Sequence, residues 1–253
     1  MIENDQLKLS GDDLIKQTSK KQWISFVIVF LISWGISVFL WFQVDADRQI
    51  LFALNNSNFS NSLLIINRLS SQYGMPVIVF IYTLYLALSQ KFTSLKKSRQ
   101  VFLLIIFSFA VAGISGDILK VIFNRVRPIH EYADQLSFYT RSASPSMPSG
   151  HSTKSVALVL PFLFYVEYKG RFHTLVKCIL VFAALMVCFS RIFLGAHYLS
   201  DVLAGIGWVF LCLPVSVFLS NKLLSKMTYQ KYERAAKIWI LVYLGFMIYL
   251  MFL

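Results

Sequence analysis

Three short groups of polar and ionisable residues interrupt the long apolar runs of this 253-residue chain. The groups are Lys120 with Arg127 and Pro128, then Pro148-Ser149-Gly150-His151, then Ser190 and Arg191 with His197 and Asp201. Together they supply three cations, two imidazoles and one carboxylate. Ionisable groups are rare at membrane depth unless they have a function. This combination predicts a site that handles phosphate.

His197 and Asp201 form the pair with the clearest chemistry. They are four residues apart, which on a helix places them on one face, one turn from each other. A carboxylate there can accept the proton of one ring nitrogen and leave the other nitrogen more basic, as in nucleophilic triads. Such an imidazole can attack phosphorus. The alternative is a pair at a helix start that only hydrogen-bonds locally.

Arg191, Lys120 and Arg127 are candidates to hold phosphate oxygens. The forked donors of a guanidinium match two phosphate oxygens, so Arg191 is the first candidate for a clamp. Lys120 and Arg127 are about two helical turns apart. The proline after Arg127 favours an extended backbone there, so we expect both cations to point into the following loop, with Asp117 placed to pair with Lys120. Each cation alone could instead be a snorkelling residue at the interface.

The segment Pro148-Ser149-Gly150-His151 is typical of a helix start. Ser149 can cap the helix, Gly150 lets an anion approach the backbone, and the free amides favour negative charge. His151 on the first turn can donate a proton to a leaving oxygen. Lys154, one turn further, can hold a headgroup charge or anchor the helix at the interface. Alone, this tetrapeptide would more often be only a cap.

The elements that must position these residues are predicted to be membrane helices. With 57% hydrophobic and 14% charged residues, the chain departs far from a soluble domain, in which about a quarter of residues are charged. A helical span needs about 20 apolar residues. We therefore expect an all-α, polytopic transmembrane helix bundle of six core spans and a seventh C-terminal span. The predicted spans are 23–42, 75–89, 101–123, 153–166, 175–193, 199–219 and 238–253.

The chain divides into three predicted parts: a polar cytoplasmic leader at 1–22, a transmembrane catalytic domain at 23–219, and a basic cytoplasmic segment with the extra helix at 220–253. The length of the first span and its polar leader argue against a cleaved signal. Between the first two spans, residues 45–74 carry apolar residues at helical spacing. They predict an interfacial helix or a loop with a short core-packing helix. Residues 124–148 predict an outer loop that covers the site.

The distribution of basic residues predicts the orientation, because positively charged loops stay in the cytoplasm. With the N-terminus inside, 16 of the 24 Lys and Arg residues fall on inner segments, and the three motifs fall on the outer side. The net charge of +12 is then mostly a topology signal with attraction to anionic lipids, and no nucleic-acid surface is expected. Cys178, Cys188 and Cys212 lie within predicted spans, where cysteine acts as a small apolar residue. They predict no disulfide and no metal cluster.

Taken together, the three motifs resemble the type 2 phosphatidic acid phosphatase (PAP2) superfamily of lipid phosphatases. The signature of that family is Lys-x6-Arg-Pro, Pro-Ser-Gly-His and Ser-Arg-x5-His-x3-Asp, and the chain carries every specified position. The resemblance extends from about residue 55 to residue 219.

The resemblance implies a metal-independent enzyme without a cofactor. His197 would be the nucleophile that becomes a phosphohistidine, and Asp201 would orient it. His151 would protonate the departing group and later activate water. The groups that would bind the phosphate are Lys120, Arg127, Arg191, Ser149 and Gly150.

The expected substrate is a membrane lipid phosphate or diphosphate, of the undecaprenyl diphosphate, phosphatidylglycerol phosphate, phosphatidic acid or lipid A type. One alternative is a lipid phosphotransferase that uses the same histidine, and another is a non-enzymatic lipid transporter. Vanadium haloperoxidases share the fold family but are soluble, unlike this chain. Its short loops and compact size favour a bacterial inner membrane, with the site facing the periplasm or the exterior.

Overall fold

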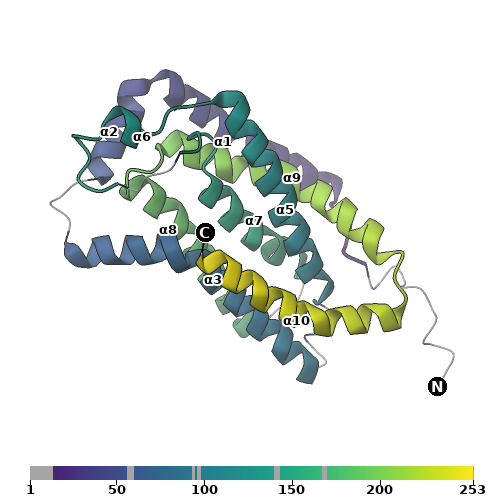
Figure 1. Ribbon diagram of the computed structural model, residues 1–253. Helices are drawn as coiled ribbons and strands as arrows, with labels where there is room; N and C mark the ends of the chain where they lie inside the picture. Colours follow the sequence, from purple (N-terminus) through teal and green to yellow (C-terminus); the bar gives the residue numbers. More distant parts are fainter. Residues whose placement is uncertain are drawn as a thin grey trace.

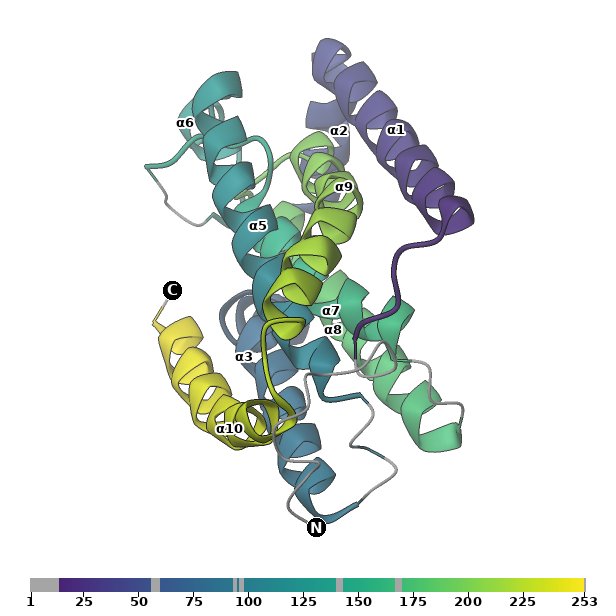
Figure 2. The same cartoon turned by 90° about the vertical axis from the view of Figure 1, so that its right-hand side faces the viewer.

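The computed structural model describes residues 14–55, 60–92, 95, 98–139, 143–166 and 170–252. Over these residues the chain is a bundle of α-helices without strands (Figures 1 and 2). Six described helices are long and apolar enough to cross a membrane, which confirms the predicted fold class. They are α1 (Lys20–Phe42), α3 (Asn61–Lys91), α5 (Gln100–Phe123), α8 (Arg171–Phe193), α9 (Leu199–Leu224) and α10 (Tyr229–Met251).

Three shorter helices complete the described part of the fold: α2 (Val44–Leu54), α6 (Pro128–Glu131) and α7 (Gly150–Tyr165). The sixteen-residue α7 corresponds to the predicted fourth span and packs against α3, α5, α8 and α9. Its side chains from Ser155 to Phe162 are all buried. A helix that is apolar on every side is stable only when other helices surround it. This position brings the first turn of α7 next to the ends of α5, α8 and α9.

Two glycines allow the close approaches that shape this end of the bundle. A Cβ atom on Gly205 of α9 would lie 2.8 Å from Oγ1 of Thr153 and 2.9 Å from the carbonyl oxygen of Ser149. Only a residue without a side chain lets α9 pack this closely against the start of α7. Gly195, between α8 and α9, has a φ of +60°, a left-handed conformation that glycine adopts without steric cost. It makes the sharp turn between the two helices.

The predicted segment at residues 45–74 divides into two elements. Its first part is the short core-packing helix α2, in which Leu51 is fully buried. Its second part is the first half of α3, which begins at Asn61 and continues into the predicted second span, with Ile66 and Leu69 exposed. The hydroxyl of Ser60 caps α3 by accepting the amide proton of Leu63, and Asn67 is buried among the helices. The first part of α3 is therefore helical although several of its residues are polar. Residues 56–59 lie outside the described part.

The predicted seventh span corresponds to α10, which begins at Tyr229 and not at Ile238. It packs along α3 (Figure 1). Arg99 reaches both carboxylate oxygens of Glu233 at 3.1 and 3.2 Å, and Tyr243 donates to the carbonyl of Phe102 at 2.7 Å. The polar start of this segment is thus helical because it pairs with α5 and its N-terminal loop.

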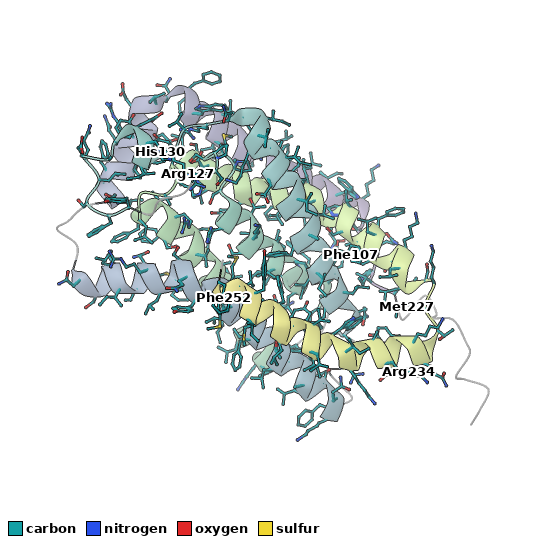
Figure 3. The ribbon with its side chains drawn as sticks, in the orientation of Figure 1. Phe107, Arg127, His130, Met227, Arg234 and Phe252 are labelled. Atoms are coloured by element: carbon teal, nitrogen blue, oxygen red, sulfur yellow. The ribbon has the colours of Figure 1, made fainter. Side chains whose placement is uncertain are left out.

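The leader and the two ends of the bundle complete the fold. Residues 1–13 of the predicted leader lie outside the described part. The backbone amide of Ile15 donates to Oδ1 of Asn221 at 3.0 Å, and Nδ2 of Asn221 donates to the carbonyl of Ile15 at 2.8 Å. These two bonds hold the segment before α1 against α9. Arg127 lies at the end of the bundle that carries α6, and Met227 and Arg234 lie at the opposite end (Figure 3). The three-part domain division stays a prediction.

Candidate active site

The three predicted motifs meet at the end of the bundle that carries α2 and α6 (Figures 1 and 2). Each predicted residue lies at or next to a helix end. Lys120 is in the last turn of α5, Arg127 precedes α6, and Ser149 precedes α7. Gly150 and His151 begin α7, Arg191 is in the last turn of α8, His197 is in the turn before α9, and Asp201 is in its first turn. Five separate segments therefore contribute to one site.

A tight turn between α8 and α9 positions His197. The backbone amides of Ala196 and His197 donate to the carbonyl of Arg191 at 3.0 and 3.1 Å. Tyr198 is the N-cap of α9, and its amide donates to Oδ2 of Asp201 at 3.0 Å. His197 thus precedes the helix on which the sequence placed it. The pair still faces one another, with Nδ1 of His197 3.4 Å from Oδ2 of Asp201.

Ser146 joins this pair. Its hydroxyl donates to Oδ2 of Asp201 at 2.5 Å and lies 3.3 Å from Nδ1 of His197. All three side chains are buried, with exposed fractions of 1% or less. Asp201 therefore faces Nδ1 of the ring both directly and through a hydroxyl that can accept the Nδ1 proton.

Arg127 contacts the opposite nitrogen of the same ring. Its Nη1 lies 3.1 Å from Nε2 of His197, and its other donors reach the carbonyl and hydroxyl oxygens of Ser144 at 2.6 and 2.9 Å. A guanidinium is a donor only, so Nε2 accepts this bond and carries no proton. The ring is neutral, with its proton on Nδ1, next to Asp201.

Burial favours the same neutral state. It lowers the pKa of His197 below the ordinary value of 6.5, and the neighbouring Asp201 opposes this shift only in part. Lowering the pKa of an imidazole keeps it unprotonated at more acidic pH. At neutral pH Nε2 therefore carries an unprotonated electron pair, to which Arg127 donates.

Lys120 and Arg191 place two further cations at the site. Nζ of Lys120 donates to the carbonyls of Pro145 and Ser146 at 2.9 and 3.4 Å, so it points into the loop as predicted. Arg191 donates from Nη1 to the hydroxyl of Ser71 on α3. Its Nε is buried and has no hydrogen-bond partner among the described residues. A buried donor without a partner is costly, and a phosphate oxygen would satisfy it.

The start of α7 has the predicted capped geometry. The Ser149 hydroxyl accepts from the amide and the hydroxyl of Ser152 at 3.5 and 3.0 Å. The amide of Ser149 donates to the carbonyl of Asp201 at 2.9 Å, which joins α7 to α9. His151 follows on the first turn, within electrostatic reach of Arg191, His197 and Arg127. An anion bound here would meet the helix N-terminus and these side chains together.

The prediction that Asp117 pairs with Lys120 is wrong. The carboxylate of Asp117 lies 4.0 Å from Nζ of Lys154, on α7, and not against Lys120. Lys120 instead donates to the two loop carbonyls, and Asp117 acts on it only through its charge. Lys154 is part of the same electrostatic neighbourhood, because its charge acts on both His151 and Lys120.

Several residues at the site were missed by sequence reasoning: Asp47, Ser71, Arg125, Ser144, Ser146 and Ser200. Arg125 lies within the unspecified x6 spacer of the first motif, so counting motif positions passes over it. Ser146 immediately precedes the Met147-Pro148 pair. The only feature of the sequence that could have indicated Ser146 as a site residue is its position in the loop predicted to cover the site. Asp47 and Ser71 are distant in the sequence and carried no signal. Residues 140–142 of the covering loop lie outside the described part.

Over the described part of the chain, no group of three or more His, Cys, Asp and Glu side chains is arranged so that it could hold a metal ion. The carboxylate of Asp201 is taken up by Arg125 and Ser146. Cys178, Cys188 and Cys212 are free cysteines in α8 and α9.

Parts of this chain are similar in sequence to a known family and to known proteins. The model of the PAP2 superfamily matches residues 101–223. An undecaprenyl-diphosphatase of Sulfolobus acidocaldarius is 25% identical over 187 residues, which cover 72% of this chain and 83% of that protein. A lipid A 1-phosphatase of Rhizobium johnstonii is 34% identical over 128 residues, or 48% of this chain and 49% of that protein. The latter match spans about half the length of the relative.

One solved structure has the same fold. The crystal structure of a transmembrane PAP2-type phosphatidylglycerolphosphate phosphatase from Bacillus subtilis matches with a TM-score of 0.56 and 22% sequence identity. The match covers 79% of this chain and 96% of that chain. The six described helices that are long and apolar enough to cross a membrane support an integral membrane protein, and this neighbour shows the same fold.

Proposed function

Over residues 101–223 this chain belongs to the PAP2 superfamily, and we propose that it is a metal-independent phosphatase that removes phosphate from a membrane lipid phosphate or diphosphate through a phosphohistidine. The single observation that carries the proposal is the two-sided contact of His197. Asp201 faces Nδ1 at 3.4 Å, and a guanidinium of the phosphate-binding group lies 3.1 Å from Nε2. The nitrogen that would attack phosphorus is therefore deprotonated and next to a cation.

In the first step, the electron pair on Nε2 of His197 forms a bond to phosphorus while the bond from phosphorus to the departing oxygen, of the lipid alcohol or of the inner phosphate of a diphosphate, breaks. His151 starts in its imidazolium form, which the negative charge of the bound phosphate favours, and gives its proton to that departing oxygen. The ring becomes positively charged, and Asp201 stabilises it through the Nδ1 proton. Lys120, Arg127 and Arg191 hold the oxygens on which negative charge is spread, which is where most of the stabilisation arises in phosphoryl transfer.

In the second step, water replaces the histidine on phosphorus. His151, now without its proton, takes a proton from the attacking water. The bond between phosphorus and Nε2 breaks, and its electron pair returns to the ring. Inorganic phosphate leaves, and both histidines are restored to their starting states. No other reactant is needed.

The distribution of charge supports a site on the outer side of the membrane, with the N-terminus in the cytoplasm. Sixteen of the 24 basic residues fall on segments that this orientation places inside, as the positive-inside rule requires. Arg127 lies at the end of the bundle opposite to the basic segment that includes Arg234 (Figure 3). A bacterial inner membrane is the proposed location.

The substrate is proposed to be a lipid with two anionic groups, such as a lipid diphosphate. Lys120, Arg127 and Arg191 are the proposed ligands of one phosphate, and Lys154, although 4.0 Å from the exposed carboxylate of Asp117, adds a fourth cation for the second. The similarity to an undecaprenyl-diphosphatase supports this choice, whereas the similarity to a lipid A 1-phosphatase supports a sugar-linked phosphate.

The direct test is release of inorganic phosphate by the purified protein in detergent, with EDTA present. The panel contains undecaprenyl diphosphate, phosphatidylglycerol phosphate, phosphatidic acid and lipid A. We expect release from at least one lipid, none from His197→Ala, and normal release from Cys188→Ala, whose thiol lies outside the site. Transfer of the phosphate to a second lipid in place of water would instead indicate a phosphotransferase. Movement of lipid between the leaflets of vesicles that contain the protein, without phosphate release, would indicate a transporter.

A further inference from the structure

A second buried carboxylate lies behind the site, outside the three motifs. Asp47 of α2 is fully buried. It accepts from Nη2 of Arg125 at 3.0 Å, from the amide of Ser200 at 3.3 Å and from the Ser200 hydroxyl. These donors come from the segment after α5 and from the first turn of α9, far from α2 in the sequence. The carboxylate therefore links the outer helix α2 to the first turn of α9.

Arg125 continues the link to Asp201. Its Nη1 donates to Oδ1 of Asp201 at 2.8 Å and to the Ser200 hydroxyl at 2.5 Å. The guanidinium carbon lies 4.2 Å from the centre of the Tyr198 ring, and only 9% of the side chain is exposed. A planar guanidinium held at both nitrogens and stacked on a ring has one orientation.

The two ends of the Asp201 carboxylate are thus assigned to different partners. Oδ1 is occupied by Arg125, whereas Oδ2 accepts from Ser146 and the Tyr198 amide and faces Nδ1 of His197. Rotation of the carboxylate would break the bond at Oδ1. The buried groups Asp47, Arg125 and Asp201 carry one net negative charge together, and that charge faces the Nδ1 proton.

We infer that Arg125 and Asp47 are positioning residues, which fix the carboxylate of Asp201 so that it holds the proton of His197 on Nδ1. Neither residue is placed to touch the phosphate. The inference rests on the proposed role of His197 as the nucleophile. Asp47 keeps the charge of Arg125 balanced, so that Asp201 keeps its own charge for the imidazole.

The position of α2 supports this role. Its C-cap residue Asn55 receives the amide of Ser137 at 2.8 Å and donates to the carbonyls of Phe138 and Phe193 at 2.6 and 2.8 Å. The helix is therefore fixed at one end to the outer loop and the end of α8, and near its start to Arg125. Figures 1 and 2 show α2 at the same end of the bundle as α6. A rigid support is what a positioning residue requires.

The same helix carries a matched control. Asp45 and Arg48 form an ion pair at 2.6 Å, with 79% and 39% of their side chains exposed. This pair has the same chemistry as Asp47 and Arg125 but makes no contact with the site. Exposed pairs of this kind contribute little to stability, so Asp45→Asn and Arg48→Met are the reference variants.

The test combines the nitrogen NMR spectrum of 15N-histidine-labelled protein with steady-state phosphate release. His197 is assigned by the signal lost in His197→Gln. In wild type and the reference variants we expect the proton on Nδ1 alone. In Asp47→Asn and Arg125→Met we expect the signal of the Nδ1 proton to shift and broaden, because Asp201 no longer holds that proton in one hydrogen bond, whereas Arg127 still donates to Nε2. We also expect a fall in kcat of about tenfold or more, as when the partner behind a metal-binding histidine is removed. KM should stay within about twofold, because ground-state binding is untouched.

A double variant separates positioning from general stability. If Arg125 acts through Asp201, adding Arg125→Met to Asp201→Asn causes no further fall in kcat. A further fall equal to that in the wild-type background would overturn the inference, as would an unchanged His197 spectrum in both Asp47→Asn and Arg125→Met. Arg125→Lys replaces Arg125→Met should the latter not fold, with the same expected direction. Should wild type release no phosphate from any lipid, the proposed function fails, and the NMR spectrum still decides this inference.

Discussion

Arg127 donates a hydrogen bond from Nη1 to Nε2 of His197, across 3.1 Å. The nitrogen expected to attack phosphorus is therefore occupied by one of the groups expected to bind the phosphate. Phosphate oxygens are better acceptors for a guanidinium than a neutral imidazole is, because the resulting hydrogen bonds are charge-assisted. Binding of the substrate would draw Arg127 from Nε2 to the phosphate and free the electron pair of His197 at the moment it is needed.

The first prediction concerns the fork of Arg127. Arg127→Lys keeps the positive charge but loses the second arm that reaches Ser144, so it cannot hold two phosphate oxygens at once. We expect kcat to fall about a hundredfold, within the range seen when a transition-state donor is removed. The measurement is steady-state phosphate release, with Arg48→Lys as the exposed control. Equal activity of the two variants would contradict a role for the fork.

The second prediction concerns the protonation of His197. Burial lowers its pKa below 6.5, so the neutral form persists as the pH falls through 6.5, where an ordinary histidine gains a proton. The 15N-histidine signal that is missing in His197→Gln should not change between pH 7.5 and 6. A change in that signal with a titration midpoint near pH 6.5 would show that burial does not lower the pKa of His197 and would contradict this prediction.

The third prediction concerns the role of His151. An acid that protonates the departing oxygen matters most when that oxygen is strongly basic. His151→Ala should therefore lose about a hundredfold or more in kcat/KM for a short-chain alkyl phosphate, and much less for p-nitrophenyl phosphate, whose leaving group needs no proton. Equal losses with the two substrates would assign His151 to binding only.

The fourth prediction concerns the contact between α7 and α9. A Cβ atom at position 205 would lie 2.9 Å from the backbone oxygen of Ser149, which cannot move without displacing the start of α7. Gly205→Ala should lower the thermal midpoint, since overpacking costs about 1–3 kcal/mol, and should reduce phosphate release. The matched control is Gly35→Ala, where no atom lies within 4 Å of the added carbon. A Gly205→Ala protein as stable and active as this control would contradict the close packing.

Much of the fold could be predicted from hydropathy, because a membrane span leaves a long apolar run in the sequence. The errors lie where polar residues are buried among helices. Asn67 sits in the first half of α3, and the polar start of α10 pairs with Arg99. Hydropathy treats such residues as solvated, so it shortened both helices. The length of the apolar run at residues 153–166 also could not show that α7 packs against four other helices.

The three motifs predicted the residues that gather at the site, since their types and spacings suit one chemistry. The groups that fix their geometry were not predictable in the same way. Arg125 stands between two motif positions, and Asp47 lies on a separate helix, so the contacts of Arg125 with Asp201 and with Asp47 depend on the folded chain. The same holds for Asp117, whose partner is across a helix interface and not one turn away.

The central claim is that His197 takes the phosphoryl group, and trapping that intermediate tests it most directly. Wild-type protein is mixed with lipid substrate labelled with 32P, quenched in alkali within milliseconds to seconds, and digested for peptide mapping. We predict label on the peptide that contains His197, formed and lost at rates that account for turnover, and absent from His197→Ala. Continued phosphate release by His197→Ala, or turnover of wild type with no label on His197, would contradict the account.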